Sequence, residues 1–470
     1  MNALEFMRRG ELVRIAKFAP DTMLLEYLRL TEKTKGTKEG CNEGDCGACT
    51  VVLGTPHNGG VRYQAVNACI LLLGQIHGKE LITVDDLARG GVLHPVQQAM
   101  VDAHASQCGF CTPGFVMSLF SLAHESRKVS RQDVVEQIAG NLCRCTGYRP
   151  IIDAGLAACD KADDHWHKAQ AETCAKLESI KGDLFVGDAN SFFAAPSTSE
   201  ALADLCVTYP EATIVSGCTD VGLWINKQMR AQPKIICTGA AKDFAKIIDH
   251  GDILAIGAGV TYEDAFDALG TISPDLKDLL KRIGARQVRA SGTIGGNIAN
   301  GSPIGDMPPA LIALDATLHL RMGKTERAIK LEDFFIAYGK QDRKPGELIW
   351  RIDVPKPKPN QIFHCAKITK RRDDDISAVM GAFLFTIEGE KVVAARIAYG
   401  GMAGTPKRAI KTEASLIGKT LQEAKHVVLD EFEPLSDMRT SAEYRTTVAN
   451  ALLQKALMQA AGETNMQVMS

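Results

Sequence analysis

Hydrophobic and polar positions change from a strand-like to a helix-like spacing within the N-terminal third of the chain. Before residue 69, short apolar runs alternate with turn-rich segments, and this pattern predicts a small α+β fold. From residue 83 to about 158, apolar residues recur at three- and four-residue steps, which predicts helices. The expected strands are 12–18, 50–53 and 60–65, and the expected helical segments are 84–88, 95–104, 114–124 and 132–140. Ser130 and Asp133 form a typical start for the last helix.

A charged stretch over residues 161–183 has no strong apolar stripe, and we expect a linker at 161–185. Residues 188–355 alternate short strands with helices and contain many glycines. The remainder, 362–461, is expected to form strands over 383–388 and 392–399, followed by helices over 421–432 and 442–461. No repeat of fixed period is visible.

Size and composition indicate a soluble protein of several domains. The chain has 470 residues, 45% of them hydrophobic and 23% charged, so two to four domains are expected. A net charge of -2 predicts no attraction to nucleic acid or to anionic membranes. No apolar run is long enough to span a bilayer, and the first 15 residues do not resemble a signal peptide. We therefore expect a cytoplasmic location, where clustered cysteines favour metal binding or catalysis over disulfides.

Eight of the 14 cysteines lie before residue 146, in two sets of four. The first set, Cys41-x4-Cys46-x2-Cys49 with Cys69, has the plant-type ferredoxin spacing for one 2Fe–2S cluster. Glycines at 40, 44 and 47 suit a loop that turns its backbone N–H groups toward the cluster sulfurs. A structural zinc site is the alternative, although such sites usually pair two short Cys-x2-Cys knuckles.

The second set is Cys108-x2-Cys111 with Cys143-x-Cys145. Both pairs adjoin helical segments, so the four thiols are expected at the ends of helices that face each other. Taken alone, Cys108-x2-Cys111 could be a thioredoxin-type redox pair. The second pair favours a metal site, because a dithiol enzyme needs no further thiols.

Two clusters in series need a partner that accepts single electrons and releases a pair, as a flavin does. Two glycine-rich segments without a Rossmann fingerprint are the candidates for its site. Residues 212–222 run from a β-like Ile214-Val215 through a Ser-Gly turn into a helix, a geometry that can hold pyrophosphate. Residues 291–314 contain five glycines within fourteen positions, so the backbone there can approach a ligand closely. The alternatives are an ordinary strand–turn–helix and, at Asp306, a plain helix N-cap.

The two cysteine sets together resemble the iron–sulfur half of the molybdenum hydroxylases, the xanthine dehydrogenase and aldehyde oxidase family. The resemblance implies an α+β multidomain chain with four parts. These are a β-grasp 2Fe–2S ferredoxin domain (1–82), a four-helix-bundle 2Fe–2S domain (83–160), a vanillyl-alcohol-oxidase-type FAD-binding domain (186–356) and a C-terminal α+β flavoprotein domain (360–465). It also matches Gln107 to a glutamine near the pterin, where an ordinary surface residue is the alternative.

The same resemblance assigns the cofactor residues. The cluster ligands are Cys41, Cys46, Cys49, Cys69, Cys108, Cys111, Cys143 and Cys145. The FAD residues are Ile214, Val215, Ser216, Gly217, Cys218, Thr219, Asp220, Val221, Gly292, Thr293, Ile294, Gly295, Gly296 and Asn297, with Asp306, Ile349 and Lys367. Ile283 stands where relatives carry an aromatic ring on the adenine, which predicts weaker FAD retention. Asp374, in the charged loop 368–377, matches the NAD side of the flavin; a solvated surface loop is the alternative.

The resemblance ends where a molybdopterin domain would start. It therefore implies the small, electron-transfer subunit of the xanthine dehydrogenase branch, which passes electrons through two 2Fe–2S clusters to FAD and NAD. A separate molybdopterin-binding large subunit would act on the purine, in a heterotetramer of two small and two large subunits. No catalytic residue for the substrate is expected on this chain. The alternatives are the equivalent subunit of a hydroxylase for aldehydes or N-heterocycles, and a non-enzymatic electron carrier or zinc scaffold.

Overall fold

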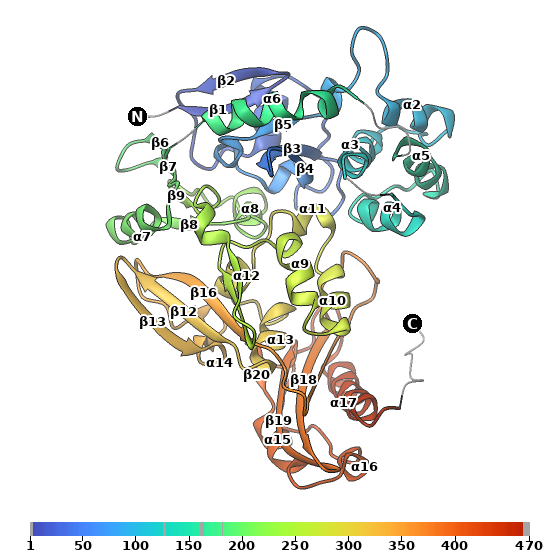
Figure 1. The fold of residues 1–470 in the computed structure, drawn as a ribbon, viewed down its shortest axis with the longest axis vertical. Helices are drawn as coiled ribbons and strands as arrows, with labels where there is room; N and C mark the ends of the chain where they lie inside the picture. The colour runs from blue at the N-terminus through green and yellow to red at the C-terminus, as the bar shows by residue number, and fades with distance from the viewer. Residues whose placement is uncertain (1–2, 126–127, 160–163, 181, 464–470) are drawn as a thin grey trace. The chain divides into compact units, whose positions relative to one another are not determined.

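The computed structural model describes residues 3–125, 128–159, 164–180 and 182–463, and Figure 1 shows the fold. The chain forms two compact units. The first contains Met1–Lys242 and Gly284–Gly292, and the second contains Asp243–Ile283 and Thr293–Ser470. Among the described residues, no helix is both long and apolar enough to cross a membrane.

The first unit begins with a mixed five-stranded sheet of order β2-β1-β5-β3-β4. Its strands are β1 (Leu4–Arg8), β2 (Glu11–Ile15), β3 (Thr50–His57), β4 (Gly60–Asn67) and β5 (Glu80–Ile82). β1 pairs antiparallel with β2 and parallel with β5. The short helix α1 (Leu24–Glu26) and the π-turn that follows it bury Leu24 and Leu28 in the same core as Phe6. The expected β-grasp fold is confirmed.

Four helices follow: α2 (Pro95–Asp102), α3 (Thr112–Ala123), α4 (Arg131–Ile138) and α5 (Arg149–Cys159). α3 is buried on all sides, as its nearly continuous apolar sequence requires. Ser130 caps α4 as expected, because its Oγ accepts from the Asp133 N–H at 3.2 Å. The expected helical bundle is therefore present, although the segment expected as a helix at 84–88 is only a 3-10 turn, Val84–Asp86.

The segment expected as a linker contains helix α6 (His165–Ser179), while residues 160–163 and 181 of that stretch lie outside the described residues. α6 packs on β3 and β4 of the ferredoxin-like sheet. It buries Trp166, Cys174 and Leu177. Three buried positions in 15 residues leave too sparse a stripe for periodicity to detect, because the sheet supplies most of the apolar surface.

A buried carboxylate, Asp164, joins α6 to the bundle. It caps α6 through the His167 N–H at 3.0 Å. Its carboxylate also accepts hydrogen bonds from Nε2 of His94 at 2.8 Å and from Nε2 of His124 at 3.0 Å. Nδ1 of His94 accepts from the Val96 N–H, so His94 is the neutral Nε2–H tautomer. Burial opposes ionisation of Asp164, but the hydrogen bonds from His124 and His94 outweigh it and hold the carboxyl pKa far below its usual range.

Asp164, His124 and His167 also have the composition of a metal site. The two imidazole rings, however, stack at 4.2 Å between centroids with 15° between their planes. A metal ion lies in the plane of each ring that binds it, and two nearly parallel stacked rings do not share such a point. We therefore interpret the cluster as a hydrogen-bonded connection between helices.

The remainder of the first unit is a four-stranded sheet of order β6-β7-β9-β8. Its strands are β6 (Leu184–Gly187), β7 (Phe192–Ala195), β8 (Thr213–Val215) and β9 (Lys234–Cys237). Helix α7 (Ser199–Thr208) connects β7 to β8, and α8 (Val221–Asn226) connects β8 to β9. β8 and β9 are parallel, so the loop after β8 opens at the carboxyl edge of the sheet, where ligands of α/β sheets bind.

The second unit begins with a sheet of order β10-β11-β16-β12-β13. Its strands are β10 (Ile247–Asp249), β11 (Ile253–Gly257), β12 (Thr317–Met322), β13 (Thr325–Lys330) and β16 (Leu348–Pro355). The helices of this part are α9 (Tyr262–Gly270), α10 (Pro274–Lys281), α12 (Ile294–Asn300) and α13 (Met307–Ala313). α12 packs against β16.

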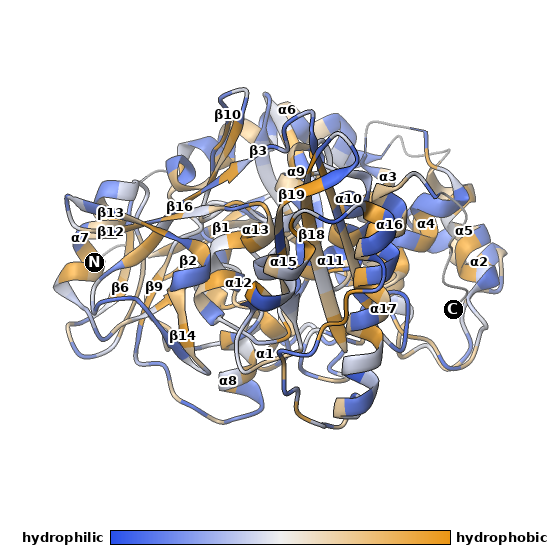
Figure 2. Cartoon of the chain, turned by 90° about the horizontal axis from the view of Figure 1, so that it is seen from below, coloured by the Kyte–Doolittle hydropathy of each residue, from blue (hydrophilic) through white to orange (hydrophobic). Residues whose placement is uncertain are grey.

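The C-terminal sheet contains β17 (Gln361–Ile368), β18 (Val379–Glu388), β19 (Lys391–Gly400) and β20 (Lys407–Arg408), followed by α15 (Ile410–Leu416), α16 (Leu421–Ala424) and α17 (Ala442–Ala460). α17 carries both hydrophobic and hydrophilic residues (Figure 2) and packs on β17 and β18. The helix expected over 421–432 ends at Ala424, because the side chain of Asn450 bonds both the N–H and the carbonyl of Leu429 instead. The multidomain α+β class is confirmed.

We predict that Asp164→Asn lowers the unfolding temperature of the protein. The amide keeps one acceptor but cannot accept from all the N–H donors around it, so the loss should amount to about 2–4 kcal/mol. Because the carboxyl pKa is depressed, this penalty should be full at neutral pH and shrink only below about pH 4, the ordinary aspartate range.

The measurement is calorimetric or fluorescence-detected unfolding at pH 7. Glu172→Gln is the matched control, since Glu172 lies on α6 in an exposed ion pair with Lys176 and such pairs contribute little. Equal unfolding temperatures for the two variants would contradict the role assigned to Asp164.

Candidate iron–sulfur and flavin sites

The first cysteine loop directs backbone N–H groups at its own sulfurs. The N–H of Cys41 donates to Sγ of Cys46 at 3.2 Å, and the N–H of Cys46 donates to Sγ of Cys41 at 3.3 Å. The N–H of Glu43 also donates to Sγ of Cys41, at 3.4 Å. The side-chain bond from Cys46 lowers the pKa of Cys41 to about 5 and raises that of Cys46. This loop is therefore preorganised to stabilise negative sulfur.

Gly40 and Gly44 allow this loop to wrap closely around its sulfurs. A Cβ on Gly40 would lie 2.7 Å from Sγ of Cys46. Gly44 has φ +84°, and a Cβ there would lie 2.5 Å from the side chain of Ile70. Both contacts are shorter than any side chain allows, so the close wrapping that the sequence suggested needs these glycines.

Cys49 and Cys69 form the other half of this site. Both are buried, and a hydrogen bond with the Cys49 thiol, reinforced by burial, raises the pKa of Cys69. Cys69 reaches Cys49 from the far end of β4, where it follows Asn67 in a 3-10 turn. The structure thus brings all four predicted ligands of the first set together as two thiol pairs.

The second set is also paired two by two. Sγ of Cys145 lies 3.5 Å from Sγ of Cys108, and the thiols of Cys111 and Cys143 are hydrogen-bonded to each other. Burial, then the bond with Cys143, raises the pKa of Cys111 to about 12. Burial also acts on Cys143, but bonds from Thr146 outweigh it and lower its pKa to about 7. Cys111 is the N-cap of α3, as expected for a ligand at a helix end.

This arrangement of thiols fits a two-iron cluster in each set. Four thiolates hold a 2Fe–2S cluster, two on each iron, and each set supplies its thiols as two close pairs. The two sets differ in exposure: Cys49 and Cys69 are buried, whereas Cys108 and Cys145 are exposed. The bundle site therefore faces the surface of its unit.

The first candidate flavin segment is the turn between β8 and α8. A Cβ on Gly217 would lie 2.0 Å from the carbonyl oxygen of Ser291, so only glycine allows this approach. The backbone of Ser216 is held in place by a hydrogen bond, because its carbonyl accepts from Nε2 of Gln75 at 2.8 Å. Cys218 adopts the left-handed conformation, with φ +64°, and burial raises its thiol pKa. The predicted segments 214–221 and 291–292 therefore adjoin within the first unit.

The second candidate segment continues into α12 of the second unit. Thr293 caps α12 by accepting from the Gly296 N–H at 3.0 Å. A Cβ on Gly295 would lie 2.4 Å from Cβ of Ala258, so the helix start packs directly on backbone. Asn297 has a buried Oδ1 without a hydrogen-bond partner among the described residues. An unpaired buried acceptor is costly unless a ligand satisfies it, which fits a bound group at this segment.

Asp306 and Lys367 form a buried ion pair of 2.7 Å, with side chains 10% and 2% exposed. Nζ of Lys367 also donates to the carbonyl of Arg282 at 2.8 Å, and Oγ of Ser377 donates to Asp306. Asp306 stands at the N-cap of α13 but makes no capping bond with its side chain. The simple N-cap role that the sequence also allowed for Asp306 is therefore absent, because Lys367 and Ser377 bond its carboxylate instead.

The structure places the remaining predicted residues separately. Ile283 is half-buried and directly follows Arg282, whose carbonyl accepts from Lys367, whereas Ile349 is buried in β16. Asp374 has φ +48°, and its carbonyl accepts from Arg371 at 2.9 Å. Gln107 is exposed beside Cys108. Sequence reasoning missed Arg282 and Ser377, because an isolated arginine or serine carries no motif.

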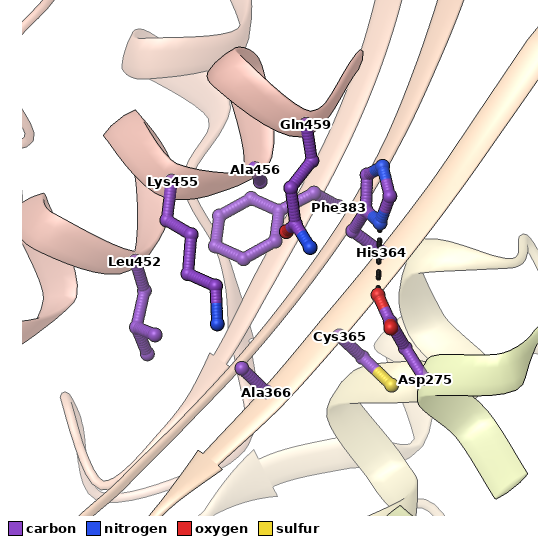
Figure 3. Close-up of a pocket in the computed structure, with 9 residues that line it drawn as sticks. All are labelled: Asp275, His364, Cys365, Ala366, Phe383, Leu452, Lys455, Ala456 and Gln459. Carbon is purple, nitrogen blue, oxygen red and sulfur yellow. Dashed lines mark hydrogen bonds and ion pairs between the residues drawn. The ribbon is translucent and has the colours of Figure 1, made fainter. Parts of the chain in front are cut away.

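A small pocket in the second unit is not a cofactor site. It lies among α10, β17, β18 and α17, and Nδ1 of His364 bonds Asp275 there at 2.8 Å (Figure 3). The cavity of about 30 Å³ has room for one or two waters. Its lining residues are Asp275, His364, Cys365, Ala366, Phe383, Leu452, Lys455, Ala456 and Gln459.

Three family models match the chain in series. Residues 83–156 match a [2Fe-2S] binding domain. Residues 188–357 match the FAD binding domain in molybdopterin dehydrogenase, and residues 364–460 match the CO dehydrogenase flavoprotein C-terminal domain.

Similar proteins include the xanthine dehydrogenase of Blastobotrys adeninivorans, 30% identical over 97% of this chain and 40% of that protein. Aldehyde oxidase 2 of Rattus norvegicus is 29% identical over 95% of this chain and 38% of its own length. The chain thus spans about two fifths of the curated relatives it matches. A carbon monoxide dehydrogenase structure from Hydrogenophaga pseudoflava matches with TM-score 0.54 and 26% identity, over 57% of this chain and 96% of that one.

The order of the three matched domains, the similarity along nearly the whole chain and the two sets of paired thiols all agree. The chain therefore belongs to the molybdenum hydroxylase family, as an electron-transfer module with 2Fe–2S and FAD-binding domains.

Proposed function

We propose that this chain is the electron-transfer subunit of a xanthine dehydrogenase. In this proposal a molybdopterin-binding large subunit oxidises the purine, and this chain carries the electrons through two 2Fe–2S clusters and FAD to NAD. The observation that carries the proposal is the combination of two paired-thiol sites with an FAD-binding domain on a chain similar to xanthine dehydrogenases along most of its length. The location is proposed to be the cytoplasm, and the assembly two small and two large subunits.

The exposed bundle site supports contact with such a partner. Cys108 and Cys145 are exposed, and Phe110 and Leu142 close to them are 48% and 39% exposed. Apolar side chains exposed around a redox site are typical of an interface. Gln107, next to Cys108 and also exposed, is proposed to approach the pterin.

The protein's own contribution is to bind and position the cofactors. Bound 2Fe–2S clusters supply one-electron transfer and bound FAD couples it to two-electron exchange with nicotinamide. The Cys41 loop donates N–H bonds to sulfur, and Asn297 offers FAD a buried acceptor. The Lys367–Asp306 pair fixes the end of β17 to α13. The proposed domains are 1–82, 83–160, 186–356 and 360–465, and Asp374 is proposed to border the NAD side.

A second candidate is the same subunit in a hydroxylase for aldehydes or N-heterocycles. The aldehyde oxidase among its similar proteins favours this reading nearly as strongly, because the reducing substrate would never touch this chain. The joining of the iron–sulfur and FAD modules in one chain favours xanthine dehydrogenase over three-chain assemblies, such as one whose matched chain covers only 57% of this chain.

The proposal that a partner subunit oxidises the substrate while this chain carries the electrons can be tested on the purified chain alone. We expect absorbance of iron–sulfur clusters and flavin, reduction of artificial dyes by NADH, and no turnover of xanthine. Adding the molybdopterin-binding partner should restore xanthine-to-NAD activity. Zinc in place of iron, or xanthine turnover by the isolated chain, would overturn the proposal.

We predict that Cys111→Ser removes about half of the cluster absorbance. Serine is a poor iron ligand, so the bundle cluster should be lost while the first site stays intact. In the complex, xanthine-to-NAD electron flow should stop while NADH-to-dye activity persists. Cys159→Ser is the control, because Cys159 lies at the end of α5 and belongs to neither paired set. Undiminished xanthine-to-NAD flow in Cys111→Ser would show that this thiol is not an essential ligand.

Asn297→Leu is expected to weaken FAD binding about three- to tenfold, the value of one hydrogen bond. Its Oδ1 makes no bond to the protein that the structure describes, so the unfolding temperature of the flavin-free protein should change little. The readout is the FAD-to-protein ratio after repeated desalting. Asn300→Leu, at the other end of α12, serves as the control, and equal retention in the two variants would remove Asn297 from the site.

A further inference from the structure

Helix α8 runs from the proposed flavin loop to the first cluster site. It begins at Val221, directly after the turn that contains Gly217, and it ends at Asn226. Six residues at 1.5 Å each span only about 9 Å. The start of α8 also packs closely on the cluster segment, since a Cβ on Gly222 would lie 3.1 Å from Cα of Ile70.

Two consecutive residues at the end of α8 bind the backbone of cluster-ligand residues. Nδ2 of Asn226 donates to the carbonyl of Cys69 at 2.6 Å. It also lies 3.3 Å from Oδ1 of Asn42, next to Cys41. Nζ of Lys227 donates to the carbonyl of Cys41 and pairs with Glu43 at 3.5 Å. One end of a single helix thus bonds two segments of the cluster site that are distant in sequence.

The ammonium of Lys227 affects the electrostatics of this site. It is bonded to the carbonyl of Cys41, a proposed ligand residue, and it is half-exposed. A positive charge on the backbone of a ligand residue stabilises the more negative, reduced form of a cluster. Glu43 and solvent screen part of this effect.

We propose that Asn226 and Lys227 are positioning residues that connect the flavin loop to the ferredoxin-type site. Asn226 holds the Cys69 segment against α8, and Lys227 holds the Cys41 segment and raises the reduction potential of the cluster there. This inference rests on the proposed cofactor sites. In this proposal α8 keeps the distance between the flavin loop and the cluster fixed. The positive charge of Lys227 favours reduction of that cluster.

The test is a redox titration of the full chain followed by electron paramagnetic resonance. The ferredoxin-type signal is identified as the one that Cys111→Ser leaves in place. Lys227→Gln is expected to lower the reduced-to-oxidised ratio of that cluster about threefold at a fixed ambient potential, which is about 28 mV at 59 mV per tenfold. Lys227→Arg should restore the ratio, and Lys234→Gln, a lysine on β9 paired with Glu211, should leave it unchanged.

The outcomes separate this inference from the proposed function. An unchanged ratio in Lys227→Gln, with both cluster signals present, overturns the role of Lys227 and leaves the electron-transfer subunit standing. A ratio that falls equally in Lys227→Arg also overturns it, because the charge is then not the cause. A chain purified with zinc and without any iron–sulfur signal overturns the proposed function and this inference with it.

Discussion

Both cluster sites depend on the hydrogen bonds and close backbone contacts around one atom, the carbonyl oxygen of Gly47. It accepts from Nδ2 of Asn141 at 3.0 Å and from Oγ1 of Thr50 at 2.6 Å. A Cβ on Gly114, in the first turn of α3, would lie 2.2 Å from it. Gly47 itself has φ +65°, and a Cβ there would meet the Gly140 carbonyl at 2.1 Å. The ferredoxin loop and the bundle thus meet backbone to backbone, with no room for side chains.

Asn141 extends this contact into a buried network. Its Oδ1 accepts from Oγ of Ser118 at 2.7 Å and from Nε2 of Gln287 at 2.9 Å. The N–H of Leu142, one residue before Cys143, donates to the carbonyl of Cys46 at 3.0 Å. Because Cys46 and Cys143 are proposed ligands of different clusters, this hydrogen bond fixes the two sites relative to each other. Nδ2 and Oδ1 of Asn141 are both bonded in this network, whereas Oε1 of Gln287 has no hydrogen-bond partner among the described residues.

Much of this arrangement could be predicted from local sequence. The Cys41 loop and its glycines carry their chemistry in consecutive residues, and α4 has its cap and first turn in four residues. The ion pair of Asp306 with Lys367 could not be predicted in this way, because 61 positions separate the partners. The same holds for Asp164, whose histidine partners lie on segments that only the fold brings together.

Helix α6 shows why sequence composition wrongly predicted a linker at residues 161–185. A charged sequence without a strong apolar stripe is typical of a solvated segment, yet Trp166 is only 4% exposed. Its ring contacts His94 and Phe120, at 5.9 Å and 5.0 Å between centroids. The core that receives this tryptophan is assembled from the sheet and the bundle, so the helix is stabilised by surface that its own sequence does not contain.

Helix α8 is likewise stabilised by its surroundings, which supports its proposed role as the connection between the flavin loop and the first cluster site. Its six residues are too few for a stable isolated helix, so its position must come from its contacts. Those contacts include Gly222 on Ile70 at one side and Asn226 on the carbonyl of Cys69 at the end. The apolar side chains of α8 also pack on the core of the first unit, at Val221, Leu223 and Ile225. A helix held in place by cluster-ligand segments cannot shift without disturbing them. The proposed flavin loop that precedes it is therefore tied to the geometry of the proposed first cluster site, as electron transfer between cofactors bound there would require.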